Sequence, residues 1–120
     1  MEFNFSNRTV IVTGGTRGIG LAIVKLFEKY NANVIATGTD ESQIIEFNKN
    51  RNGRHTTYKH LDFTSESSVN TFISGLKEHS KIDVLINNAG VNKINSIQDI
   101  EMKDWDWISN VNLRGPFQIT

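Results

Sequence analysis

The sequence predicts a doubly wound α/β fold, in which about four parallel strands lie between two layers of helices in a three-layer αβα arrangement. Two observations predict it. Short runs of β-branched residues alternate with longer segments of helical periodicity. A glycine cluster, residues 14–20, joins the first strand to the first helix. Strands that alternate with helices pair in parallel through right-handed crossovers, so helices cover both faces of the sheet.

Four segments are expected to form the strands. The first is residues 9–13, which ends in the glycine cluster, and the second is residues 34–37. The third, residues 56–61, has a weaker pattern. The fourth, residues 82–87, is the most apolar. We expect it to be buried on both faces, in the middle of the sheet rather than at its edge.

Apolar residues recur at helical spacing between the strands. In the first helix the expected buried face consists of Ile19, Ala22, Ile23, Leu26, Phe27 and Tyr30. The second helix, residues 40–50, is followed by the turn signal Asn52-Gly53.

The third helix is expected to begin at Thr64-Ser65-Glu66, which offers a capping hydroxyl and an acid in the first turn. Its apolar stripe is Val69, Phe72, Ile73 and Leu76. The last helix runs from about Met102 to the end of the chain. One of its faces carries Trp105, Ile108 and Asn112.

Composition excludes several classes of function. The chain has 120 residues, with 13 Lys and Arg against 13 Asp and Glu, so it lacks the basic excess of a nucleic-acid-binding protein. Without cysteine it has no disulfide, thiolate nucleophile or zinc–thiolate site. His55, His60 and His79 show no ligand spacing, so we expect no metal site.

No signal-peptide pattern or long apolar run is present. We therefore expect a single soluble cytoplasmic domain without a membrane partner.

The glycine cluster has the spacing Gly-x3-Gly-x-Gly. Between a strand and a helix, glycines allow a tight turn, a close approach of backbone N–H groups to a pyrophosphate, and close helix–strand packing. The helix N-terminus adds a partial positive charge. The sequence therefore predicts a phosphate-binding loop, and the alternative is a loop that only turns the chain. Its residues are Gly14, Thr16, Arg17, Gly18, Ile19 and Gly20.

Three further segments follow in order: His60-Leu61-Asp62-Phe63-Thr64, Asn87-Asn88-Ala89-Gly90, and Val111-Asn112-Leu113 with Gly115 and Phe117. Together with Thr13-Gly-x3-Gly-x-Gly, they resemble the motifs of the short-chain dehydrogenase/reductase family over residues 5–120. The resemblance implies that residues 1–120 form one Rossmann-like NAD(P)-binding domain, the incomplete N-terminal part of the family's domain. It also implies hydride transfer between a nicotinamide cofactor and a carbonyl/hydroxyl pair.

The resemblance implies roles for individual residues. Asp62 and Phe63 match the adenine-contacting segment, and Asn88, Ala89 and Gly90 match the segment beside the nucleotide. Independently, Asp62 stands at the carboxyl end of a parallel strand, where ligands of open α/β sheets bind. The alternatives are a helix-capping acid at Asp62 and an ordinary turn after the fourth strand.

Asn112 is a polar amide between the apolar residues Ile108 and Val111, so we expect it to be buried and hydrogen-bonded. The resemblance implies that Asn112 is the catalytic Asn, which holds the main chain and a water that relays protons to a lysine. The alternative is a core Asn that braces the helix. Gly115-Pro116 follows, and a proline inside a helix removes a hydrogen bond, so we expect a local distortion.

The preference between NADP and NAD depends on the end of the second strand. NAD binding usually employs an acid there, which accepts a hydrogen bond from the ribose 2′-OH, but Gly38 stands at that position. Arg17 and Thr39 can bind a 2′-phosphate, which favours NADP over NAD. NAD stays open because Asp40 is close by and because Arg17 can be a solvated loop charge.

In the family, a catalytic Ser and a Tyr-x3-Lys pair lie beyond the fourth helix. The two tyrosines here, Tyr30 and Tyr58, have Val34 and Asp62 four positions later. We therefore expect the 120 residues alone to bind the dinucleotide without catalysis. There are two alternatives to a part of an oxidoreductase. One is a module whose only function is to bind a dinucleotide without catalysis, and the other is a module that only self-associates.

Self-association is expected from the fourth strand. Without a following strand, its apolar edge is open, and an open edge is a template for pairing. We expect a homo-oligomer through residues 84–86 and the Trp107 face of the last helix. Trp105 is expected to lie in the core.

Overall fold

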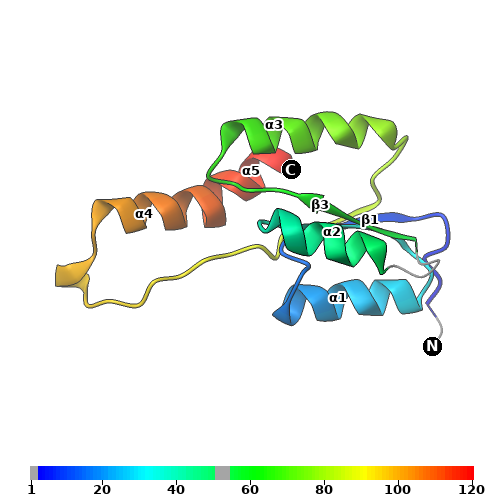
Figure 1. The fold of residues 1–120 in the computed structure, drawn as a ribbon, viewed down its shortest axis with the longest axis horizontal. Helices are drawn as coiled ribbons and strands as arrows, with labels where there is room; N and C mark the ends of the chain where they lie inside the picture. Colours follow the sequence, from blue (N-terminus) through cyan, green and yellow to red (C-terminus); the bar gives the residue numbers. More distant parts are fainter. Residues whose placement is uncertain (1–2, 51–54) are drawn as a thin grey trace.

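The structure is a computed structural model that describes residues 3–50 and 55–120. It confirms the doubly wound α/β fold (Figure 1). One parallel sheet has the strand order β3-β2-β1-β4, with β1 (Thr9–Val12), β2 (Asn33–Gly38), β3 (Thr56–His60) and β4 (Val84–Ile86). The helices are α1 (Gly18–Lys29), α2 (Glu41–Lys49), α3 (Glu66–Gly75), α4 (Met102–Ser109) and α5 (Gly115–Ile119). The expected Asn52-Gly53 turn lies outside the described residues.

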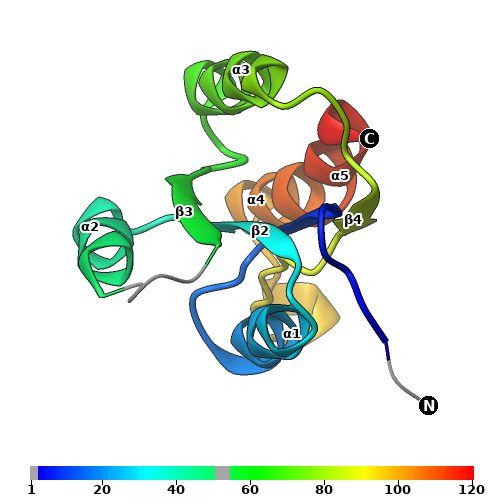
Figure 2. The same cartoon turned by 90° about the vertical axis from the view of Figure 1, so that its right-hand side faces the viewer.

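Side chains of the central strands alternate between two cores. Val10, Val12, Val34 and Ala36 face α1 and α2. Ile11 and Ile35 face the opposite core, which contains residues of α3 and Val111. Figure 2 shows these two helix layers on either side of the sheet. The alternation follows from the period of two along a strand.

The buried face of α1 differs from the predicted one. Ile19 is 75% exposed and Leu26 is 55% exposed, whereas Gly20 and Val24 are buried. Gly20 packs against the glycine loop, where a Cβ atom would collide with the carbonyl oxygen of Gly14, and Val24 packs into the core against the sheet. α1 therefore contacts the rest of the fold through Gly20 and Val24, and Ile23 and Phe27 are only partly buried beside them.

The caps of α2 and α3 explain where these helices begin. Asp40 Oδ1 accepts hydrogen bonds from the backbone N–H groups of Ser42 (3.0 Å) and Gln43 (3.2 Å). Ser65 Oγ accepts one from Ser68 N–H (3.2 Å), which confirms the predicted capping hydroxyl. Such caps typically contribute about 1 kcal/mol each.

The outer edge of β3 is closed by a side chain. Asn48 of α2 donates from Nδ2 to the Tyr58 carbonyl (2.9 Å) and accepts from Tyr58 N–H at Oδ1 (2.8 Å). The neighbouring Phe47 ring stacks on the Tyr58 ring with centroids 4.4 Å apart. Asn48 thus takes the place of a paired strand at the middle of this edge.

The prediction that the fourth strand lies mid-sheet and is buried on both faces is wrong for the described chain. β4 stands at the sheet edge and pairs only with β1, and its three residues are half-buried. A strand paired on one side leaves part of its side chains open to water. The apolar composition of this strand therefore does not indicate whether it lies in the middle or at the edge of the sheet.

The expected last helix is divided in two. A π-helical turn at Asn110–Arg114 separates α4 from α5, and Pro116 lies in the first turn of α5. This confirms the expected distortion, because Pro116 has no N–H to donate to the Asn112 carbonyl four residues earlier. None of the helices in the described ranges has the length and apolarity needed to cross a bilayer.

Two burial predictions for this region are wrong. Trp105 is 60% exposed instead of lying in the core, and Asn112 is exposed rather than buried. The reason is visible in Figure 1, where α4 and the segment before it project beyond the sheet. With only part of this helix against the sheet, residues on its apolar face are left uncovered.

Candidate functional site

The glycine loop is fixed to the end of β2. Gly14 N–H donates to Thr37 Oγ1 (3.2 Å), and Gly15 N–H donates to the Thr37 carbonyl (2.9 Å). Gly14 and Gly18 have φ angles of +65° and +56°, which side chains other than glycine adopt only with strain. These hydrogen bonds and backbone angles therefore fix the conformation of the loop at the carboxyl ends of the strands.

The glycines of the loop serve different purposes. A Cβ at Gly14 would lie 2.9 Å from Ala89 Cα, and one at Gly20 would collide with the Gly14 carbonyl oxygen. A Cβ at Gly18 would meet nothing within 4 Å. Gly14 and Gly20 are thus needed for packing, while the backbone at Gly18 borders open space that a ligand can approach.

Asn88 and Thr13 link this loop to the end of β4. Asn88 Nδ2 donates to the carbonyl oxygens of Thr13 and Gly14, both at 3.1 Å. The backbone N–H groups of Asn88 (3.1 Å) and Ala89 (3.0 Å) donate to Thr13 Oγ1. Thr13 is 1% exposed. Its role was not predicted, although a hydroxyl at the end of a strand just before a glycine cluster is a usable signal.

The N-terminus of α1 is open toward this loop. Its N-cap residue, Arg17, makes no capping hydrogen bond through its side chain, and the first turn has no acidic residue. Backbone N–H groups of an uncapped first turn are free to bind an anion. The Arg17 side chain is exposed and makes no ion pair within residues 3–50 and 55–120.

The end of β2 lies beside the loop. Gly38 is buried against Thr16, whose methyl carbon would be 2.6 Å from a Cβ at position 38. Thr39 is exposed at the end of the strand. The Asp40 carboxylate is engaged in capping α2, and the hydrogen bonds from the Ser42 hydroxyl and the Gln43 N–H hold its pKa below the ordinary value.

Asp62 and Phe63 follow β3 at the same edge of the sheet. Asp62 Oδ1 accepts hydrogen bonds from the Thr64 N–H (2.9 Å) and hydroxyl (2.6 Å). Asp62 does not cap α3, because the N-cap is Ser65. Phe63 is 8% exposed and its ring fills the space next to Gly115. The Phe63 side chain is therefore part of the core, and an adenine contact by either residue stays a prediction.

Asn112 joins the π-helical turn to the segment after β4. Its Oδ1 accepts from Val91 N–H, and its Nδ2 donates to the Val91 carbonyl, both at 2.8 Å. Gly90, next to Val91, lies against this amide, since a Cβ there would be 3.5 Å from Asn112 Oδ1. Asn112 thus holds main chain, as the resemblance implied, in an exposed position.

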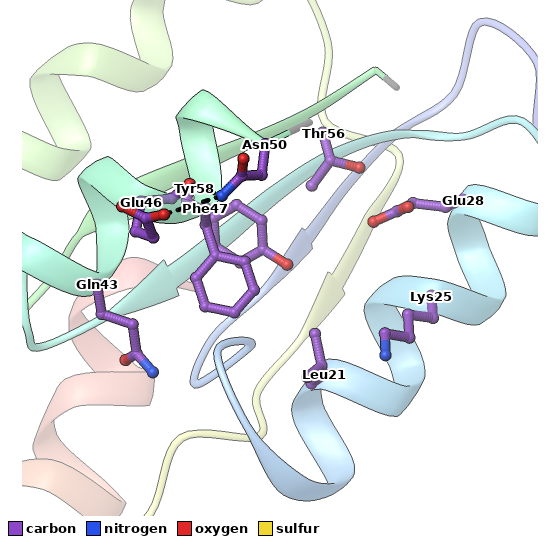
Figure 3. Close-up of a pocket in the computed structure, with 9 residues that line it drawn as sticks. All are labelled: Leu21, Lys25, Glu28, Gln43, Glu46, Phe47, Asn50, Thr56 and Tyr58. Carbon is purple, nitrogen blue, oxygen red and sulfur yellow. Dashed lines mark hydrogen bonds between the residues drawn. The ribbon is translucent and has the colours of Figure 1, made fainter. Parts of the chain in front are cut away.

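Among residues 3–50 and 55–120, two cavities of similar volume lie apart from the glycine loop. One, of about 420 Å³, lies between α1 and α2 over the stacked Phe47 and Tyr58 rings (Figure 3). The other, of about 410 Å³, lies between residues 92–100 and α4 and includes Asn112. Its wall contains an ion pair between Lys93 Nζ and Asp104 Oδ2 (3.1 Å). Among residues 3–50 and 55–120, no three His, Cys, Asp or Glu side chains gather as metal ligands would.

Comparison with known proteins identifies this arrangement. The family model for short chain dehydrogenases matches residues 8–120. The chain belongs to the short-chain dehydrogenase family.

Similar proteins include two 3-oxoacyl-acyl-carrier-protein reductases named FabG. The one from Chlamydia pneumoniae is 34% identical, over 94% of this chain and 47% of its own length. The one from Escherichia coli K12 is 31% identical, over 98% and 48%. A crystal structure of a metagenomic short-chain oxidoreductase in complex with NADP has a TM-score of 0.85 and 28% identity, over 96% of this chain and 54% of its own. The chain therefore spans about half the length of these three relatives.

Proposed function

We propose that this chain forms the dinucleotide-binding part of a short-chain dehydrogenase that transfers hydride between NADP(H) and a carbonyl/hydroxyl pair. The observation that carries the proposal is the open, uncapped N-terminus of α1 behind a glycine loop fixed by Thr37 and Asn88. Gly18 leaves space there for a phosphate to approach the backbone. The bound cofactor would supply or accept the hydride, and the chain's residues would hold and orient it.

The preference for NADP rests on charge and space at the end of β2. Gly38 offers no carboxylate to a ribose 2′-OH, and the exposed Arg17 side chain has no ion-pair partner among the described residues. Arg17 and Thr39 would bind the 2′-phosphate by charge-assisted hydrogen bonds. The NADP complex of the metagenomic relative supports the same choice.

Titration of the purified 120-residue protein with NADPH and NADH, followed by nucleotide fluorescence and calorimetry, tests the proposal. We expect saturable binding that favours NADPH. Arg17→Ala should weaken NADPH binding about tenfold or more, since a hydrogen bond to a charged group contributes about 1.5–3 kcal/mol. The same change should affect NADH binding little, because NADH lacks the 2′-phosphate.

Lys77→Ala serves as the control. Lys77 is an exposed cation in the turn after α3, which lies near the amino ends of the strands and so away from the glycine loop. It should leave both affinities unchanged. Absence of binding by either nucleotide would contradict the proposed function.

The 120 residues contain no Tyr-x3-Lys pair, so we propose that they bind the cofactor without turning it over. Carbonyl reduction by the 120-residue protein, measured as NADPH oxidation with a panel of small ketones, would contradict this part of the proposal.

A further inference from the structure

We propose that the methyl group of Thr16 is a determinant of cofactor specificity, because it fills the space that an acidic side chain at position 38 would need. The proposal rests on the proposed function, because it explains the preference of the binding site for NADP by a specific contact. It assigns the preference to a steric contact between the loop and β2, in addition to the positive charge of Arg17.

Backbone conformation does not require glycine at position 38. Gly14 and Gly18 have positive φ angles, but Gly38 does not. The constraint at Gly38 is space. A Cβ there would lie 2.6 Å from Thr16 Cγ2, 3.2 Å from Ile44 Cδ1 and 3.3 Å from Thr16 Oγ1. Only the first of these distances is shorter than real Cβ contacts allow, so the Thr16 methyl is the principal obstacle.

Thr16 has little freedom to move away. It is 9% exposed, and the residues before it are fastened to β2 by the two hydrogen bonds to Thr37. Gly15 lies so close to the sheet that a Cβ there would be 2.9 Å from Ala36 Cβ. The loop and β2 are therefore closely packed at both Gly15 and Thr16. A residue larger than glycine at position 38 must push Thr16 away from β2.

The consequence concerns the ribose of the cofactor. An acid at the end of the second strand binds the 2′-OH of NAD and repels the 2′-phosphate of NADP. With threonine at position 16, such an acid does not fit, so an Asp introduced at Gly38 is displaced from the position it needs. Serine at position 16 would keep the hydroxyl and remove the methyl.

The experiment has a steric arm that requires no cofactor. Gly38→Ala should lower the melting temperature by roughly 5 °C, and Thr16→Ser combined with Gly38→Ala should show a smaller loss relative to Thr16→Ser alone. Gly75→Ala is the matched control, because a Cβ at Gly75 meets nothing within 4 Å. Gly75→Ala should not lower the melting temperature. Equal losses from Gly38→Ala in both backgrounds would overturn the proposal.

The cofactor arm compares Gly38→Asp with the double variant Thr16→Ser/Gly38→Asp by NADH and NADPH titration. We expect both variants to lose NADPH affinity and only the double variant to gain NADH affinity, by about tenfold over the single variant. If Gly38→Asp alone binds NADH as tightly as the double variant, the proposal is overturned. If the wild type binds neither nucleotide, the proposed function fails instead, and the melting temperatures still decide whether the steric contact exists.

Discussion

Single side chains at the carboxyl edge of the sheet join segments that are far apart in sequence. Asn88 links the end of β4 to the glycine loop, and Asn112 links the π-helical turn to Val91. Asn112 uses both the acceptor and the donor of its amide, whereas Asn88 donates from Nδ2 to two carbonyl oxygens. Thr13 completes the set, since its hydroxyl accepts from two successive N–H groups.

Asn88 provides a test at this scale. Asn88→Ala removes the donor to two backbone carbonyls, so we expect the free energy of unfolding to fall by about 1–3 kcal/mol. Asn88→Asp should cost more, because it places a carboxylate against carbonyl oxygens. Urea denaturation measures both. Asn70→Ala, on the exposed side of α3, should change stability by no more than about 0.5 kcal/mol. A similarly small effect of Asn88→Ala would contradict the linking role.

At the scale of elements, the start of β4 is fastened to β1 by Asp83. Its Oδ2 accepts from Thr9 N–H (2.9 Å), and its Oδ1 lies near Lys81 Nζ (3.1 Å) and Arg8 (3.3 Å). The Thr9 hydrogen bond, then Lys81, and to a lesser degree Arg8, lower the pKa of the Asp83 carboxyl despite partial desolvation. The edge strand is thereby held at the end opposite the glycine loop.

The lowered pKa predicts a pH dependence of stability. A carboxyl whose pKa is lower in the folded than in the unfolded state stabilises the fold above its unfolded pKa of about 3.9, and this contribution is lost as pH falls through the folded-state value. Asp83→Asn should therefore destabilise the protein at pH 7, and the difference from wild type should shrink toward pH 3. Thermal melting across this range measures it.

Asp106→Asn, which removes an exposed carboxylate on α4, is the control for this pH series. A difference between wild type and Asp83→Asn that stays constant from pH 7 to pH 3 would show that the Asp83 charge does not stabilise the fold.

At the scale of the whole molecule, the two edges of the sheet and the projecting α4 differ in what covers them. The β3 edge is closed by Asn48, whereas β4 lies at the opposite edge. Six large apolar side chains around α4 are more than half exposed: Ile94, Ile97, Met102, Trp105, Leu113 and Phe117. Exposed large apolar side chains in this number favour an interaction site.

Self-association through β4 and the Trp107 face of the last helix remains a prediction, and Trp107 is 38% exposed. Sedimentation at rising protein concentration should show dimers or larger species, and replacing Trp105 and Trp107 by Gln should shift them toward monomer. Ile45→Gln, which removes an exposed apolar side chain from α2, should leave the distribution unchanged. Monodisperse wild-type monomers with strongly protected β4 amides in hydrogen exchange would contradict the prediction.

Much of the fold could be predicted from the sequence because it depends on local periodicity. The order of strands and helices, the Ser65 cap and the distortion before Pro116 all follow from residues close together in the chain. The residues of the candidate site were predicted from glycines and amides at strand ends, and their roles in binding a cofactor stay predictions. The linking role of Thr13 was missed because its partners, Asn88 and Ala89, are about 75 positions away.

The sequence by itself therefore determined the α/β order, the glycine loop and the family, because each is encoded in short motifs. Tertiary structure decided which face of α1 is buried, that β4 lies at an edge, and that Trp105 and Asn112 are exposed. It also decided that Thr16 fills the space beside Gly38. These features depend on how close separate segments approach one another, and hydrophobic periodicity carries no information about such distances.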